Sequence, residues 1–130
     1  MDQRLFAAAK SAMGHAYAPY SKFQVGAAIL AENGQIYSGC NVENAAYPIG
    51  TCAEAGAIAA MARDGARQIR EIVIIGGGDQ LCTPCGGCRQ RIREFAEPET
   101  KVHVCGPKGL RRTFTRDELL PSSFGPENLS

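Results

Sequence analysis

The sequence contains Cys52-Ala53-Glu54 and, after one long interval, Pro84-Cys85-Gly86-Gly87-Cys88. Three cysteine thiolates can hold a zinc ion and leave its fourth coordination position to water. Glu54 follows Cys52 by two residues, a spacing from which its carboxylate can reach that water. The proline, the glutamate and the separated second pair occur together, so this pattern is more specific than a Cys-x-x-Cys pair alone. We therefore expect a catalytic zinc site.

Both cysteine groups precede segments that favour helix. Residues 53–63 are small or helix-favouring, and residues 88–97 place Ile92, Phe95 and Ala96 where they can share one helix face. The free N–H groups and the macrodipole at a helix start stabilise a nearby thiolate by about 0.3 to 1 kcal/mol. A thiolate of low pKa is the form that binds metal. We therefore expect both cysteine groups at helix N-termini, with Glu54 in the first turn.

The remaining pattern predicts alternating helices and strands. Residues 2–16 have helical spacing, and residues 24–31 and 35–41 are predicted strands joined by the Asn33-Gly34 turn of a hairpin. Residues 71–76, 101–105 and 110–114 are three further strands, and Thr115 and Glu118 have capping-box spacing before a short final helix. The expected fold is a single α/β domain over residues 1–130, a three-layer α/β/α structure with a mixed five-stranded sheet.

The other cysteines leave alternatives open. With Cys82, which lies three residues before Cys85, a closed four-cysteine structural zinc site is chemically possible, but such a site has no need of Glu54. We expect Cys82 to be a spectator thiol, and Cys40 and Cys105 to be small buried hydrophobic residues. Six cysteines also allow three disulfides. No apolar leader follows Met1 and 45% of the residues are hydrophobic, so we expect reduced thiols and a cytoplasmic protein.

Charge and hydropathy argue against polymeric and membrane partners. The formal net charge is +1, from 14 Lys and Arg against 13 Asp and Glu, which gives no broad cationic field for a nucleic acid. Arg89, Arg91 and Arg93 alternate within one predicted helix and are expected to form a solvated face. No segment contains the roughly 18 consecutive apolar residues that a transmembrane helix needs. We expect a small-molecule substrate, no nucleic acid polymer and no membrane.

Several motifs along nearly the whole chain resemble those of the homotetrameric cytidine deaminases that act on free nucleosides. The Cys-x-Glu and Pro-Cys-x-x-Cys combination is the signature of zinc deaminases in general. The stretches that point to the free-nucleoside family are residues 18–23, 25–28, 39–45, 84–90 and 119–121, with Phe124-Gly125-Pro126. The resemblance implies the cytidine deaminase fold, a homotetramer, one zinc ion per chain and a place in pyrimidine salvage.

The resemblance also implies a reaction and a set of roles. Cys52, Cys85 and Cys88 would bind zinc, and zinc-bound hydroxide would attack C4 of cytidine or 2'-deoxycytidine with Glu54 as the proton shuttle, releasing ammonia. The family also implies substrate contacts. Asn41 and Glu43 would bind the ribose 3'-hydroxyl, and Ala45 and Tyr47 of a neighbouring subunit would close the sugar site. Phe23 and Phe124 would stack on the substrate, and the backbone of Ala53 would bind the amino group.

One position departs from the family pattern. The family often has an arginine directly after the catalytic glutamate, where this chain has Ala55. Three thiolates around one dication then lack a neighbouring positive charge, so a more distant residue such as Arg89 or Arg91 must compensate. The departure leaves open two alternatives to cytidine deamination: deamination of a modified cytosine nucleoside or nucleoside antibiotic, and a non-catalytic zinc-stabilised domain.

Overall fold

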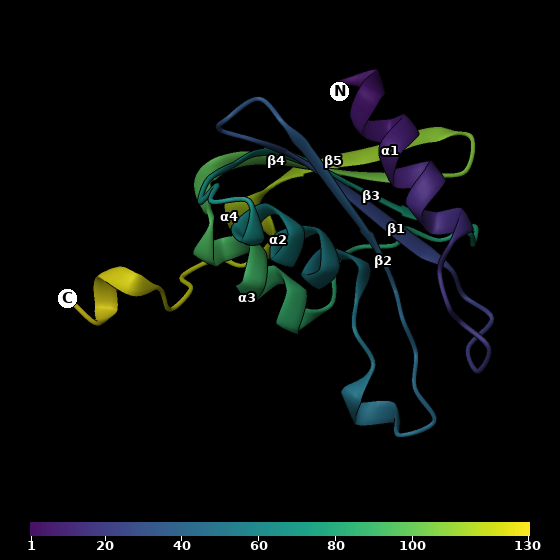
Figure 1. The fold of residues 1–130 in the computed structure, drawn as a ribbon. Coiled ribbons are helices and arrows are strands. Elements are labelled where there is room, and N and C mark those ends of the chain that lie inside the picture. The colour runs from purple at the N-terminus through teal and green to yellow at the C-terminus, as the bar shows by residue number, and fades with distance from the viewer.

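The computed structural model describes residues 1–130 and places one mixed β-sheet between two layers of helices (Figure 1). The predicted three-layer arrangement and the five-stranded mixed sheet are therefore confirmed. In chain order the main elements are α1 (Gln3–Gly14), β1 (Val25–Ala31), β2 (Ile36–Cys40), α2 (Ala53–Arg63), β3 (Ile69–Gly76), α3 (Gly86–Glu94), β4 (Ala96–Gly106), β5 (Gly109–Thr115) and α4 (Arg116–Leu119). Short 3-10 helices cover Tyr47–Ile49 and Pro126–Asn128.

The sheet has the strand order β2-β1-β3-β4-β5. β3 and β4 are parallel, and the other neighbouring pairs are antiparallel. Parallel neighbours need a crossover connection, and α3 with the loop before it supplies that connection between β3 and β4. The loop that carries Cys85 therefore leaves the sheet at the carboxyl end of the central strand β3.

Apolar residues on the two faces of the sheet form separate clusters. On one face, Leu5 and Ala9 of α1 pack with Val73 and Ile75 of β3. On the other face, the cluster contains residues of three helices and of the sheet: Met61 of α2, Ile92 of α3, Leu119 of α4, and Ile72 and Ile74 of β3. The two helices that follow the cysteine groups therefore lie in the same layer, on the same face of the sheet.

The ends of most elements agree with the sequence pattern, except at α3 and at β4, which begins at Ala96 rather than at the predicted residue 101. The helix predicted over residues 53–63 is confirmed, and so is the capping box between Thr115 and Glu118. The helix predicted over residues 88–97 is wrong at both ends, because α3 begins at Gly86 and ends at Glu94. Ala96 pairs with Ile69 and starts β4. A buried alanine fits that strand as well as a helix face, so spacing alone could not separate the two.

The cysteines form no disulfide. Cys105 is fully buried, as predicted, whereas Cys40 is only half-buried, so the prediction for Cys40 is wrong. Cys40 ends β2 at the edge of the sheet, where only β1 pairs with it. No helix of the structure has both the length and the apolar character needed to cross a bilayer.

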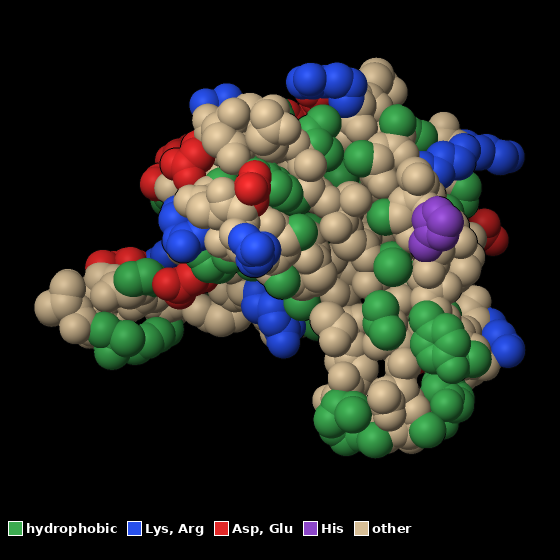
Figure 2. All heavy atoms as spheres, in the orientation of Figure 1, with side chains coloured by type: hydrophobic (Ala, Val, Ile, Leu, Met, Phe, Trp, Pro, Cys, Tyr) green, Lys and Arg blue, Asp and Glu red, His purple; other side chains and the backbone are tan.

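Two segments project from the body of the protein: the arm (residues 42–51) and the C-terminal tail (residues 122–130) (Figure 1). The arm exposes Val42, Tyr47 and Ile49, and Figure 2 shows hydrophobic side chains gathered on it. The rings of Tyr20 and Tyr47 lie 5.7 Å apart, so the loop before β1 packs against the arm. Projecting apolar segments of this kind are typical of surfaces that contact another protein chain.

Gly39 on β2 sets the distance between the sheet and α2. A Cβ atom at this position would lie 2.5 Å from the backbone nitrogen of Ala57 and 2.6 Å from the carbonyl oxygen of Ala53. Only a glycine lets the strand approach the helix backbone this closely. The position of Cys52 and Glu54 at the start of α2 depends on this contact.

We expect Gly39→Ala to force α2 away from the sheet, at a cost of about 1 to 3 kcal/mol in the free energy of unfolding. Because α2 carries Cys52 at its start, zinc content should fall as well. Gly14→Ala is the matched control, since a Cβ at Gly14 meets no atom within 4 Å. Urea denaturation and metal analysis of both variants would check this, and equal stability and zinc content in the two would contradict it.

Candidate active site

Three cysteine side chains converge where α2 and α3 begin. Cys52 is the N-cap of α2, Cys85 is the N-cap of α3, and Cys88 lies in the first turn of α3. Their Sγ atoms all lie within 4.8 Å of one another. Tetrahedral zinc with Zn–S distances of about 2.3 Å requires sulfur atoms about 3.8 Å apart. Small side-chain adjustments bring the three thiolates to that geometry, so the donor set fits zinc.

The surroundings of the three thiols differ. Burial raises the pKa of Cys52 and, more strongly, that of the fully buried Cys88. The backbone N–H of Cys88 lowers the pKa of Cys85, as expected for a group at a helix start. A dication among the three would oppose the effect of burial, because it favours the deprotonated form of each ligand. The cluster is therefore suited to a metal ion rather than to a single reactive thiolate.

Glu54 lies beside the cluster and is almost completely buried. The residue is 5% exposed, and burial raises the pKa of its carboxyl group above the usual value. It lines a cavity of about 200 Å³ together with residues of both cysteine segments and of the strands beside them: Val25, Asn41, Cys52, Ala53, Cys82, Thr83 and Cys85. A buried carboxyl group with a raised pKa, next to three potential metal ligands and inside a cavity, is suited to proton transfer.

Cys82 lines the same cavity but lies outside the three-sulfur cluster. Burial raises its pKa to about 11, so the thiol is neutral at pH 7. Its side chain packs against Gly76, where a Cβ atom would lie 2.6 Å from Cys82 Cβ. The sequence could not place this thiol, because its position depends on the contact of the loop with the end of β3.

The three arginines of α3 have different partners. Arg91 Nη1 lies 3.6 Å from Cys88 Sγ, and this is the guanidinium that contacts the cluster. Arg89 donates hydrogen bonds to the carbonyl oxygens of Pro84 and Leu119, at 2.7 and 2.9 Å. Arg93 is 8% exposed, so the expectation of a solvated arginine face is wrong for this residue. The partners of Arg89 and Arg93 lie outside α3, so helical spacing did not identify them, whereas Cys88 lies three residues before Arg91 on the same helix.

Asn41 and Glu43 hold the loop before β1. Asn41 Oδ1 accepts a hydrogen bond from Val25 N at 2.8 Å, and its Nδ2 donates to Phe23 O at 2.8 Å. Glu43 accepts from the backbone N–H groups of Tyr20 and Ser21 and from the Ser21 hydroxyl, which lowers the pKa of Glu43. Both side chains therefore fix the loop that carries Phe23. No sequence pattern indicated the contact between Ser21 and Glu43.

The other expected substrate residues do not reach the zinc cavity within one chain. Tyr47 and Glu43 line a separate cavity of about 340 Å³ beside the arm. Phe23 lines a third hollow, next to Gly77 and Gly78. Ala45 is an exposed residue of the arm, and Phe124 is 58% exposed on the tail. The structure brings Cys52, Ala53, Glu54, Asn41 and Cys85 together around one cavity, with Cys88 behind it, and leaves the others at the surface.

Comparison with known proteins agrees with this geometry. The family model described as the cytidine and deoxycytidylate deaminase zinc-binding region matches residues 1–104. The chain belongs to this family. It is 43% identical over 128 residues to a cytidine deaminase of Sporosarcina psychrophila, across 98% of this chain and 94% of that protein. A cytidine deaminase of Mycobacterium tuberculosis is 36% identical over 122 residues, across 93% and 87% of the two chains.

Solved structures of the same family share the fold. The crystal structure of a cytidine deaminase from Burkholderia pseudomallei matches with a TM-score of 0.89 and 38% identity, over 95% of this chain and 99% of that one. A cytidine deaminase structure from Mycobacterium leprae matches with a TM-score of 0.79 and 38% identity, over 92% and 97%. The resemblance to cytidine deaminases inferred from the motifs is confirmed. The zinc-binding region and the three-cysteine cluster together fit one zinc ion per chain.

The structure separates Cys82 from the three clustered cysteines, which gives a direct test. We expect Cys52→Ala, Cys85→Ala and Cys88→Ala each to lose zinc, because each removes one of three thiolates. Cys82→Ala should keep one zinc ion per chain, as a catalytic site leaves its fourth position open. Metal analysis of the purified variants checks both statements. Loss of zinc from Cys82→Ala would instead indicate a closed four-cysteine structural site.

Proposed function

We propose that residues 1–130 act as one deaminase domain that converts cytidine and 2'-deoxycytidine to uridine and 2'-deoxyuridine, with release of ammonia. The observation that carries this proposal is the buried carboxyl group of Glu54 in the same cavity as the three-cysteine cluster. A closed structural zinc site has no use for such a group. The similarity to curated cytidine deaminases over almost the whole chain favours cytidine over a modified cytosine nucleoside.

The reaction needs a nucleophile and a proton carrier. Zinc, held by Cys52, Cys85 and Cys88, supplies Lewis acidity that makes a water molecule nucleophilic at neutral pH. Glu54 takes a proton from that water and gives a proton to N3 of the ring. Once the oxygen has bonded to C4, Glu54 takes the remaining proton from the C4 hydroxyl group and gives it to the amino nitrogen. The bond from C4 to that nitrogen then breaks, so ammonia leaves and a C4 carbonyl group remains. A raised pKa brings Glu54 closer to neutrality, where accepting and donating a proton are both favourable.

The residues around the cavity position the nucleoside. The backbone of Ala53, between Cys52 and Glu54, would accept a hydrogen bond from the amino group. Asn41 lines the zinc cavity and Glu43 lines the separate cavity beside the arm, and both hold the loop of Phe23. Both side chains would bind the ribose 3'-hydroxyl. Phe23 would stack on the base. This arrangement supports recognition of a nucleoside rather than of a free base.

A nucleoside panel tests the proposal. Cytidine and 2'-deoxycytidine should release ammonia, whereas 3'-deoxycytidine and free cytosine should be poor substrates, because the groups built to bind the sugar are then left unpaired. Glu54→Gln is the control that retains zinc, and its turnover should fall by about 100-fold to 10,000-fold. Cytosine turning over as well as cytidine, or near-normal turnover by zinc-loaded Glu54→Gln, would contradict the proposal.

We infer that the active form is a homotetramer. A cavity of about 200 Å³ is small for a whole nucleoside, and the arm and tail expose Tyr47 and Phe124 with no partner in their own chain that covers them. A second copy of the chain would cover these side chains and complete the pocket, with Ala45 and Tyr47 closing the sugar site and Phe124 stacking on the substrate. The absence of disulfides among six cysteines supports a cytoplasmic location. Deamination of a free nucleoside would give the protein a role in pyrimidine salvage.

Mixing two variants of low activity tests this assembly. Glu54→Gln lacks the proton carrier and Phe124→Ala lacks the aromatic side chain of the tail. If Phe124 completes the pocket of a neighbouring subunit, some pockets of a mixed tetramer contain both wild-type residues, and part of the cytidine deaminase activity returns. Native mass spectrometry verifies the mixing. Mixed tetramers that stay inactive would place Phe124 in the pocket of its own subunit.

Arg91 offsets the charge that Ala55 leaves uncompensated. Three thiolates and one dication sum to a negative charge, and the guanidinium of Arg91 contacts the sulfur of Cys88. A charge-assisted hydrogen bond to a thiolate ligand reduces the electron density that the sulfur gives to zinc and keeps the metal a stronger Lewis acid. Arg89 is occupied by two carbonyl oxygens, so it does not share this role.

We expect Arg91→Met to lower turnover of cytidine or zinc affinity by about 10-fold to 100-fold, the usual cost of losing a group that supports metal ligands. Arg63→Met, on an exposed arginine in the last turn of α2, is the matched control for the loss of charge. Adding Ala55→Arg to Arg91→Met should restore part of the loss, because it returns a guanidinium to the site. If Arg91→Met and Arg63→Met have the same turnover and zinc affinity, Arg91 does not compensate the charge of the thiolates.

A further inference from the structure

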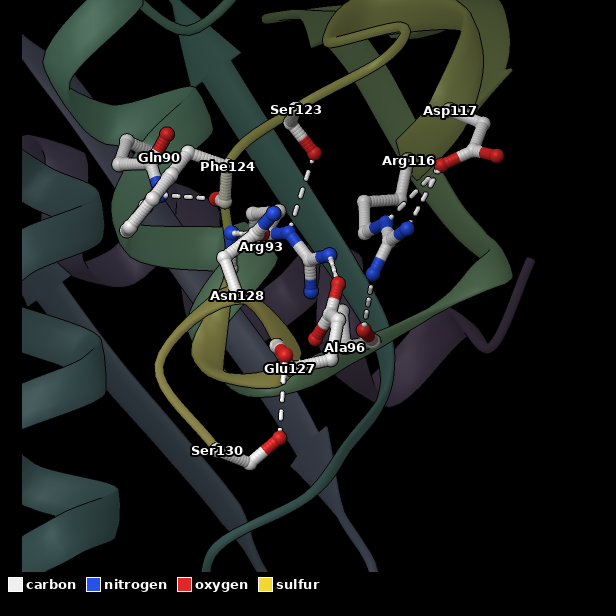
Figure 3. Close-up of polar contacts among 11 residues, drawn as sticks. Gln90, Arg93, Ala96, Arg116, Asp117, Ser123, Phe124, Glu127, Asn128 and Ser130 are labelled. Carbon is white, nitrogen blue, oxygen red and sulfur yellow. Dashed lines mark hydrogen bonds and ion pairs between the residues drawn. The ribbon is translucent and has the colours of Figure 1, made fainter.

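The C-terminal tail is held by the helix that carries two of the three clustered cysteines. Figure 3 shows side chains of α3 directed at the tail. Gln90 Nε2 donates a hydrogen bond to the carbonyl oxygen of Phe124 at 2.9 Å. Arg93 Nε donates to Ser123 Oγ at 3.0 Å, and Arg93 Nη2 forms an ion pair with Glu127. The tail therefore has fixed attachments although it contains only one short 3-10 helix.

Arg93 is buried beneath the tail. Its side chain is 10% exposed, although arginine is rarely buried without partners. Gly125 lies directly over the guanidinium, since a Cβ at this position would fall 2.3 Å from Arg93 Cζ. A side chain at position 125 would therefore displace either the tail or Arg93. The fit of a glycine onto a buried, paired arginine is a specific contact rather than the chance approach of a surface side chain.

The contacts fix the backbone on both sides of Phe124 and leave its ring free. The carbonyl oxygen of Phe124 is held by Gln90, and the N–H of Gly125 donates to Asn128 Oδ1 at 2.8 Å. The Phe124 residue is nevertheless 58% exposed. An aromatic ring on a fixed backbone loses less conformational freedom when it enters a pocket than one on a free chain end. The attachment therefore prepares Phe124 for binding to another surface.

We propose that Arg93 and Gln90 are positioning residues that anchor the tail so that Phe124 is presented to the substrate pocket of another copy of the chain. This inference rests on the proposed function, in which Phe124 completes that pocket. The inference adds to that function the contacts that hold Phe124 in position. The same α3 helix holds Cys85 and Cys88 at its start and the tail further along, so one rigid element sets both the metal ligands of its own subunit and the aromatic group offered to a neighbour.

The test compares Arg93→Gln with a matched buried arginine. Arg116 is 7% exposed, donates to Ala96 O at 2.8 Å and forms its ion pair with Asp117 rather than with a residue of the tail (Figure 3). Arg116→Gln therefore controls for the loss of a buried guanidinium. Gly125→Ala perturbs the same contact from the side of the tail. Thermal unfolding of each purified, zinc-loaded variant separates general destabilisation from release of the tail.

The first measurement is limited chymotrypsin digestion with mass spectrometry, which reports cleavage after Phe124. We expect faster cleavage in Arg93→Gln and Gly125→Ala than in the wild type and Arg116→Gln. The second measurement is steady-state kinetics with cytidine. Because a misplacement of about 1 Å can cost about 100-fold in rate, kcat/KM should fall, with KM rising more than kcat falls. A merely structural role would lower the unfolding temperature and leave the KM of the folded enzyme unchanged.

Phe124→Ala separates failure of this inference from failure of the proposed function. If Phe124→Ala raises KM and Arg93→Gln leaves both KM and cleavage at wild-type values, the anchoring role is overturned and the role of Phe124 stands. If Phe124→Ala leaves KM unchanged, the pocket role of Phe124 is overturned, and with it the positioning role of Arg93, whatever the digestion shows. A rise of KM in Phe124→Ala, Arg93→Gln and Gly125→Ala, with Arg116→Gln unchanged, supports the inference.

Discussion

The convergence of three thiolates at the starts of two helices is the constraint on which the rest of the structure depends. Sulfur atoms from two distant segments lie within 4.8 Å of one another, which requires α2 and α3 to begin at the same place in one layer. The sheet provides that layer, because α3 is the crossover between the parallel strands β3 and β4. Gly39 lets β2 approach α2 closely enough to complete the arrangement.

The chemistry follows from the first turn of each helix. Glu54 comes two residues after a cysteine N-cap, so the helix buries its carboxyl group beside the metal cluster and raises its pKa. On α3, Cys88 and Arg91 are three residues apart and therefore share one helix face, which brings a guanidinium to the sulfur. The tail contacts come from further along the same helix. In the proposed function, local helix geometry thus organises proton transfer, charge compensation and the presentation of Phe124.

Local patterns predicted much of this, and contacts between distant segments account for the rest. The cysteine spacing predicted the cluster and the helix starts, and the run of small or helix-favouring residues over 53–63 predicted the extent of α2. Spacing failed at Ala96, because strand pairing with Ile69 decided its conformation. It also failed at Arg93, because the burial of this residue depends on a tail about thirty positions away. No local pattern reveals which residue of an irregular segment will cover which side chain.

The central claim is an open zinc site of three thiolates with one position left for water. Zinc K-edge X-ray absorption of the purified protein measures the ligands directly. The account predicts three sulfur atoms at about 2.3 Å and one oxygen atom at about 2.0 Å, the coordination of a catalytic site. Four sulfur atoms at about 2.3 Å, with no oxygen, would show that Cys82 closes the site and would contradict the proposed deaminase reaction.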